Sequence, residues 1–177
     1  MAEGTLAVIV DNFTAKQNVS IFARNAGCQV EVEEKEGLYR LTITKGQSAP
    51  KRQEKPEQHA RTGPKETPAY LITTNVLGQG SPDLGAVLMK SLMVTLAEQQ
   101  PAPSALVFLN SGVYLTTEGS PVLEQIQKLE ASGTEILSCG TCLDYYRLKE
   151  KLQAGRISNM YEINSLLTRA RKVITVG

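Results

Sequence analysis

Residues 135–146 read Glu-Ile-Leu-Ser-Cys-Gly-Thr-Cys-Leu-Asp-Tyr-Tyr, and this stretch joins an apolar strand to a helix. The run before the first cysteine is typical of a buried strand. Apolar residues at helical spacing follow from Leu143, and Gly155 predicts the end of that helix. Cys139 and Cys142 therefore lie where a strand ends and a helix begins.

This junction suits thiol chemistry. The first turn of a helix presents free backbone N–H groups and the positive end of the helix dipole. A thiolate is stabilised there, so we expect Cys142 to titrate below the free-thiol pKa of about 8.5. Cys139 completes a Cys-x-x-Cys pair and would resolve a bond made at Cys142. A structural zinc is the alternative, but the remaining candidate ligands, Cys28 and His59, lack ligand spacing.

Composition excludes several classes of protein. The chain has 177 residues, a net charge of +1 and 41% hydrophobic residues. That charge does not favour a nucleic-acid or membrane surface, and no apolar run is long enough to cross a bilayer. Three cysteines form no disulfide framework, so we expect a cytoplasmic protein. Because free cysteines are usually buried, we expect Cys28 to be a small core residue. Nothing in the sequence calls for a cofactor.

The N-terminal part, residues 1–46, predicts a small βαββ module. An apolar strand over 5–10 is followed by Asn12 as a helix N-cap, a helix over 14–26 and two alternating strands over 29–34 and 38–43.

A linker is predicted over 47–67. It is rich in proline, glutamine and charge, and it holds His59, the single histidine. Such a composition buries too little apolar surface to offset the entropy of ordering. We therefore interpret His59 as a solvated residue rather than a base or ligand.

Residues 68–177 alternate buried strands with helices, which predicts a parallel sheet covered by helices on both faces. The helix over 81–99 is apolar nearly all round, which favours a homo-oligomer. Ligands of such sheets bind beyond the carboxyl ends of the strands. The segments ending there converge on Cys142 and supply the side chains that we expect to line a pocket: Asn75, Asn110, Ser111, Thr141, Tyr145, Asn159 and Met160.

Two resemblances to known families follow. Residues 139–144, Cys-Gly-Thr-Cys-Leu-Asp, resemble the active-cysteine motif of DsrE-like sulfur-relay proteins, with Cys142 at the family's cysteine, and the resemblance extends over about 110 residues. Residues 3–12 and 37–39 resemble the Gly-led strand and the final turn of a TusA/SirA-like module that is incomplete. The combination resembles the YedF group, which is linked with selenium metabolism. Where many DsrE relatives carry an Ala-Arg-Gly-like stretch, this chain has Tyr145, Tyr146 and Arg147.

The resemblance implies a three-layer α/β/α DsrE-like domain over 68–177, assembled as a dimer, trimer or hexamer. It implies a sulfurtransferase-like carrier that holds a persulfide or selenopersulfide on Cys142. That atom would come from a donor protein and pass to an acceptor protein. Backbone N–H groups of residues 141–143 would stabilise the anion, and Cys139 would resolve the adduct. Two alternatives stay open: a binding or scaffold protein without chemistry, and a dithiol redox protein that uses both cysteines.

The family pattern also places a strand, a Cys-Pro-x-Pro motif and a helix before residue 3. We therefore expect the coding frame to extend upstream of Met1, with cysteine or selenocysteine in the missing motif. Natural loss of that half, or a cloned fragment, is the alternative.

Overall fold

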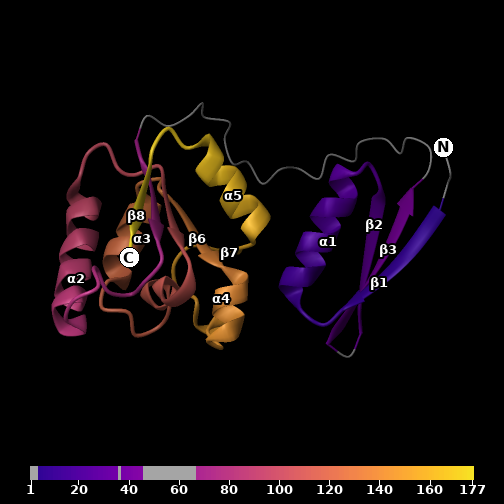
Figure 1. Ribbon diagram of the computed structural model, residues 1–177, viewed down its shortest axis with the longest axis horizontal. Helices are drawn as coiled ribbons and strands as arrows, with labels where there is room; N and C mark the ends of the chain where they lie inside the picture. The colour runs from indigo at the N-terminus through magenta and orange to yellow at the C-terminus, as the bar shows by residue number, and fades with distance from the viewer. Residues whose placement is uncertain (1–3, 36, 46–66) are drawn as a thin grey trace. The chain divides into compact units, whose positions relative to one another are not determined.

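The computed structural model describes residues 4–35, 37–45 and 67–177, and the chain divides into two compact units with the boundary after Arg61. The predicted linker, apart from Thr67, and His59 within it lie outside the described residues, as do the first three residues. Figure 1 shows the two units, which are described separately below.

The first unit is the predicted βαββ module. Its elements are β1 (Gly4–Val10), α1 (Phe13–Asn25), β2 (Gln29–Lys35) and β3 (Leu38–Lys45), and the strands form an antiparallel sheet in the order β1-β3-β2. Asn12 caps α1 as predicted, since its Oδ1 accepts the N–H of Ala15 at 2.7 Å. Leu41 on the central strand is fully buried, whereas Leu6 on β1 is 60% exposed, because α1 packs on β2 and β3. Cys28 is a free, half-buried thiol rather than a fully buried core residue.

The second unit is the predicted three-layer α/β/α fold. Its five strands are all parallel and follow the order β7-β6-β5-β4-β8. They are β4 (Ala69–Ile72), β5 (Ala105–Phe108), β6 (Glu135–Cys139), β7 (Arg156–Ser158) and β8 (Val173–Val176). The helices are α2 (Pro82–Glu98), α3 (Leu123–Ala131), α4 (Gly140–Tyr145) and α5 (Met160–Arg169), with 3-10 segments η1 (Asn110–Thr116) and η2 (Lys149–Lys151).

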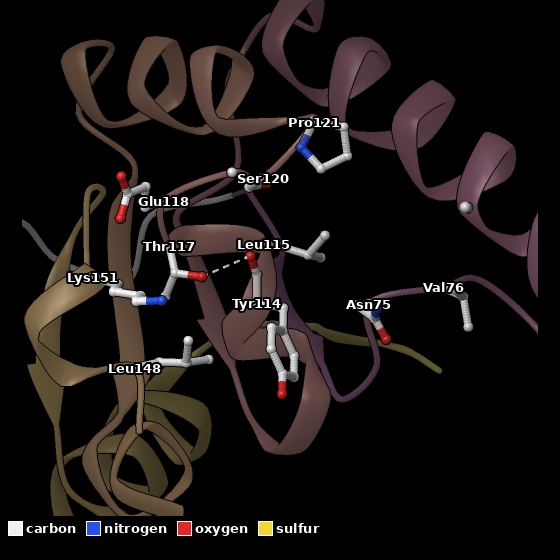
Figure 2. A pocket seen from close by; sticks show the side chains of 12 residues that line it. Asn75, Val76, Tyr114, Leu115, Thr117, Glu118, Ser120, Pro121, Leu148 and Lys151 are labelled. Carbon is white, nitrogen blue, oxygen red and sulfur yellow. Dashed lines mark hydrogen bonds between the residues drawn. The ribbon is translucent and has the colours of Figure 1, made fainter. Parts of the chain in front are cut away.

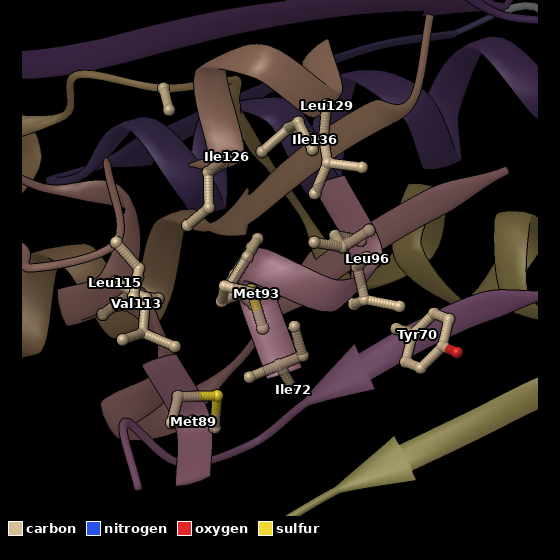
Figure 3. Packing of buried hydrophobic residues seen from close by; sticks show 14 of the residues in the cluster. Tyr70, Ile72, Met89, Met93, Leu96, Val113, Leu115, Ile126, Leu129 and Ile136 are labelled. Atoms are coloured by element: carbon tan, nitrogen blue, oxygen red, sulfur yellow. The ribbon is translucent and has the colours of Figure 1, made fainter. Parts of the chain in front are cut away.

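The larger core fills one face of this sheet, where α2 and α3 cover it (Figure 3). Met89, Met93 and Leu96 of α2 are at most 1% exposed and belong to the same cluster as Ile72 of β4. On the other face, Val107 and Leu137 pack with Cys139 and with Ile163 of α5. Strands buried on both faces explain their uninterrupted apolar sequence.

A stripe on α2 remains outside the core. Leu84, Val87, Leu88 and Val94 are between 40% and 62% exposed, and their spacing places them on one side of the helix. The helix is therefore apolar on its outer side as well as its inner side, as its sequence predicts.

The helix that carries the cysteines is much shorter than predicted. It ends at Tyr145 instead of reaching Gly155, because Arg147 adopts a left-handed φ of 57°. The Leu148 N–H then bonds to the Leu143 carbonyl at 2.8 Å, a closing bond typical of helix ends. Residues with this φ are commonly glycine, so an arginine gave no signal of the stop.

Candidate functional site

The two cysteines lie at the carboxyl edge of the parallel sheet. Cys139 is the last residue of β6 and also the N-cap of α4, so it stands at the predicted junction. Its side chain is 3% exposed within the smaller core cluster, whereas Cys142, one turn into α4, is half-buried. Both thiols are free. Cys142 is therefore the thiol that an incoming molecule can reach.

A backbone N–H from another element contacts the sulfur of Cys142. Asn110, the first residue of η1, donates its N–H to the Cys142 Sγ at 3.1 Å. Asn110 reaches this position through a left-handed φ of 47°, which few residues other than glycine and asparagine adopt. The donor to the free thiol comes from the loop after β5, which the sequence did not predict. The stabilisation of a persulfide anion by the N–H groups of residues 141–143 stays a prediction.

The expected low pKa of Cys142 is wrong. Burial raises the pKa of this thiol to about 11, a hydrogen bond with Cys139 adds to the increase, and the Asn110 N–H opposes it. Burial disfavours the charged thiolate, and a six-residue helix offers a short column of aligned peptide dipoles to counter it. At neutral pH, Cys142 is accordingly a thiol.

One of three neighbouring tyrosines contacts the Asn110 side chain. The Tyr146 hydroxyl donates to the Asn110 Oδ1 at 2.8 Å. The Tyr146 ring centroid lies 5.0 Å from that of Tyr114 and 5.0 Å from that of Tyr145, the latter edge-on. Tyr145 itself is 80% exposed. The apolar spacing that follows Leu143 in the sequence includes Tyr146, and it gives no sign of this polar contact.

Beneath the cysteines, two buried hydroxyls join η1 to β6. Thr116 Oγ1 and Ser138 Oγ lie 2.8 Å apart, and Thr116 also donates to the Val113 carbonyl at 2.9 Å. Nearby, Gly112 packs so closely on the β4 backbone that an added Cβ would overlap the Ile72 carbonyl oxygen. These contacts hold the loop that carries Asn110 against the sheet.

The remaining predicted pocket residues differ in exposure and in hydrogen bonding. Thr141 is exposed on α4, and Ser111 is half-buried beside Asn110. Asn159 is 3% exposed and caps α5, accepting the Glu162 N–H at 3.0 Å, while Met160 is 55% exposed. The structure thus brings Asn110 to the cysteines and gives Asn159 a role in holding a helix.

Asn75 lines a separate hollow of about 430 Å³ beside the tyrosines. Figure 2 shows Tyr114 and Leu148 on one side of it, with Asn75 and Val76 opposite. Tyr114 is common to this hollow and to the aromatic contact with Tyr146.

An ion-pair cluster holds the neighbouring strand. Arg156 on β7 contacts Glu162 at 2.6 Å and Glu135 at 2.9 Å, and the Ser158 hydroxyl donates to Glu162 at 2.6 Å. Glu162, and then Glu135, raise the pKa of Arg156 further above its ordinary value. Since Ser158 pairs in register with Cys139, this cluster supports the strand end that carries the buried thiol.

Within the described residues, no group of three or more His, Cys, Asp or Glu side chains is arranged to hold a metal ion. No helix among them is both long enough and apolar enough to cross a membrane.

Comparison with known families is consistent with this arrangement. Residues 78–176 match the family model of the DsrE/DsrF-like family. The chain belongs to the DsrE/DsrF-like family. Residues 1–45 match a second family model, that of sulfurtransferase TusA. Both are sulfur-relay families, so the matches support a general role in sulfur relay between proteins.

The chain was also compared with curated proteins and with solved structures. No curated protein matches the chain. Among solved structures, the DsrE/DsrF-like chain is similar to the crystal structure of the ychN protein from E. coli, at 19% identity, with 62% of this chain and 99% of that chain covered and a TM-score of 0.48.

Proposed function

We propose that this protein is a sulfur carrier that holds a persulfide on Cys142 and passes the outer sulfur atom to an acceptor protein. The observation that carries the proposal is the difference between the two thiols of the motif. Cys142 is half-buried and has a backbone N–H on its sulfur, whereas Cys139 is buried behind it. Stabilisation of an anionic sulfur by a backbone N–H is the contact that a persulfide carrier needs.

Loading requires the thiolate of Cys142. Its sulfur attacks the outer sulfur of a donor persulfide, the S–S bond of the donor breaks, and the donor leaves as a thiolate. A new S–S bond forms on Cys142, so the sulfur atom changes carrier without net oxidation. Since the pKa of Cys142 is raised to about 11, loading at neutral pH proceeds through a small thiolate fraction that the Asn110 N–H favours.

Unloading has two chemically balanced routes. In the first, an acceptor thiolate attacks the outer sulfur, and Cys142 leaves as a thiolate. In the second, the Cys139 thiolate attacks the inner sulfur, which releases hydrosulfide and leaves a Cys139–Cys142 disulfide. A dithiol reductant must then restore both thiols. The Cys-x-x-Cys spacing of the two thiols supports this second route.

The resemblance to the YedF group extends the proposal to selenium, because a selenopersulfide would load and leave by the same steps. Donor and acceptor proteins in the cytoplasm are the expected partners, and the outer stripe of α2 supports a homo-oligomer.

Mass spectrometry after incubation with glutathione persulfide tests the proposal. We expect one added sulfur atom on the peptide containing Cys142 in the wild-type protein. Cys142→Ser should abolish that adduct, and Cys139→Ser should allow it to form but prolong its lifetime. An unaltered adduct in Cys142→Ser would show that the wrong cysteine has been assigned.

The same spectra separate the alternatives. A dithiol redox protein would lose two hydrogens in the wild type and would gain no sulfur even in Cys139→Ser, the variant in which a carrier keeps the added sulfur atom. A scaffold without chemistry would show neither change.

A further inference from the structure

The left-handed backbone of Asn110 aims its N–H at the sulfur of Cys142. With a φ of 47°, the Asn110 nitrogen lies 3.1 Å from the Sγ, and the residue itself is exposed, two positions after the end of β5. Asparagine tolerates this conformation better than most residues but does not require it. The contacts of Thr116 and Gly112 hold the backbone of this loop, and a contact to the Asn110 side chain would fix the residue itself.

Tyr146 supplies that contact and closes a ring of three hydrogen bonds. Its hydroxyl donates to the Asn110 Oδ1 at 2.8 Å, and its own N–H donates to the Cys142 carbonyl at 3.0 Å. The third bond is the one from Asn110 to the Cys142 sulfur. Each of the three residues is therefore tied to the other two, so a displacement of Asn110 must disturb Tyr146.

The Tyr146 ring is itself held in place. It is half-buried, and the rings of Tyr114 and Tyr145 contact it, each with its centroid 5.0 Å away. The hydroxyl is thus presented to Asn110 by a side chain with little freedom to rotate.

We propose that Tyr146 is a positioning residue whose hydroxyl holds Asn110 so that the Asn110 N–H remains on the sulfur of Cys142. Tyr146 does not touch the reacting atoms and acts through Asn110. Its role in sulfur transfer rests on the proposed function, whereas its effect on the Cys142 thiol does not.

The test is the pH dependence of Cys142 alkylation by iodoacetamide in the full chain, followed on the Cys142 peptide by mass spectrometry. Tyr146→Phe keeps the ring and removes the hydroxyl. We expect the alkylation rate at neutral pH to fall roughly two- to tenfold, as for the loss of one hydrogen bond, with the pH curve displaced upward. Tyr114→Phe is the matched control, because it removes a hydroxyl from the neighbouring ring, and its curve should coincide with that of the wild type.

A double-mutant cycle identifies the route of the effect. Asn110→Gly retains the N–H and accepts a positive φ, but it lacks the amide oxygen that Tyr146 binds. In that background, Tyr146→Phe should change nothing further. An unshifted curve for Tyr146→Phe, or an equal shift with and without Asn110→Gly, overturns the proposal.

Because iodoacetamide supplies no sulfur, this experiment is independent of persulfide formation. If Tyr146→Phe shifts the curve while wild-type protein never gains sulfur from glutathione persulfide, the positioning role stands and the carrier function fails. Thermal unfolding of each variant verifies that the fold is retained.

Discussion

Removing the Cys139 thiol should make Cys142 more reactive, although Cys139 is the expected resolving residue. Burial and the hydrogen bond with Cys139 together raise the pKa of Cys142 from 9.0 to about 11. Below its pKa a thiol gains about tenfold in thiolate for each pH unit, so this difference of two units lowers the thiolate fraction at neutral pH about 100-fold. Cys139→Ala removes the second cause and leaves burial, the largest, in place.

We therefore expect the pKa of Cys142 in Cys139→Ala to fall, and its alkylation at pH 7 to increase by less than about 100-fold. In wild-type protein the rate should increase through pH 10 without reaching a plateau. Iodoacetamide labelling between pH 7 and 11, quantified on the Cys142 peptide, measures both curves. Cys28→Ala, which removes a thiol of the first unit, is the control and should leave the curve unchanged.

Two results would refute this reasoning. One is a wild-type midpoint near the starting value of 9.0, which would mean that burial does not disfavour the thiolate. The other is an unchanged or raised pKa of Cys142 in Cys139→Ala, which would mean that the buried thiol does not stabilise the protonated form.

Two further predictions concern assembly and stability. The outer stripe of α2 should make the protein a dimer or larger in light scattering; Val87→Glu should weaken that assembly, and a wild-type monomer of 19.2 kDa would contradict it. Gly112→Ala should lower the free energy of unfolding by about 1–3 kcal/mol in denaturant titration, because its Cβ meets the Ile72 carbonyl. Gly80→Ala, where a Cβ meets nothing within 4 Å, is the control, and equal stabilities of the two variants would count against the clash.

The alternation of strands and helices could be predicted because the central strands of the sheet are short apolar runs. Residues 105–108, Ala-Leu-Val-Phe, are buried throughout, and an apolar run this short, with Pro103 just before it, indicates an interior strand rather than a helix. The early end of α4 could not be predicted in this way. Arg147 carries no sign that it will adopt a left-handed backbone, and the apolar spacing continues past it.

Some features of the candidate site could likewise be predicted from the sequence, and others could not. The position of Cys139 and Cys142 at a strand-to-helix junction follows from local sequence. The pKa of Cys142 does not, because it depends on how deeply the sulfur is buried and on contacts between separate elements. Likewise, the contact between Tyr146 and Asn110 joins residues 36 positions apart, and no periodicity in the sequence reports it.

The two thiols of the motif differ in how firmly the surrounding backbone holds them. Cys139 ends a strand paired with neighbours on both sides, and the buried Thr116–Ser138 contact sits just before it. Cys142 rides on a helix of six residues, which its own backbone hydrogen bonds stabilise weakly. The distance between the two sulfurs must change to admit an added atom or to form a disulfide. We expect α4 to move when it does. We therefore expect the sheet to keep Cys139 in place and the short helix to carry the movement of Cys142.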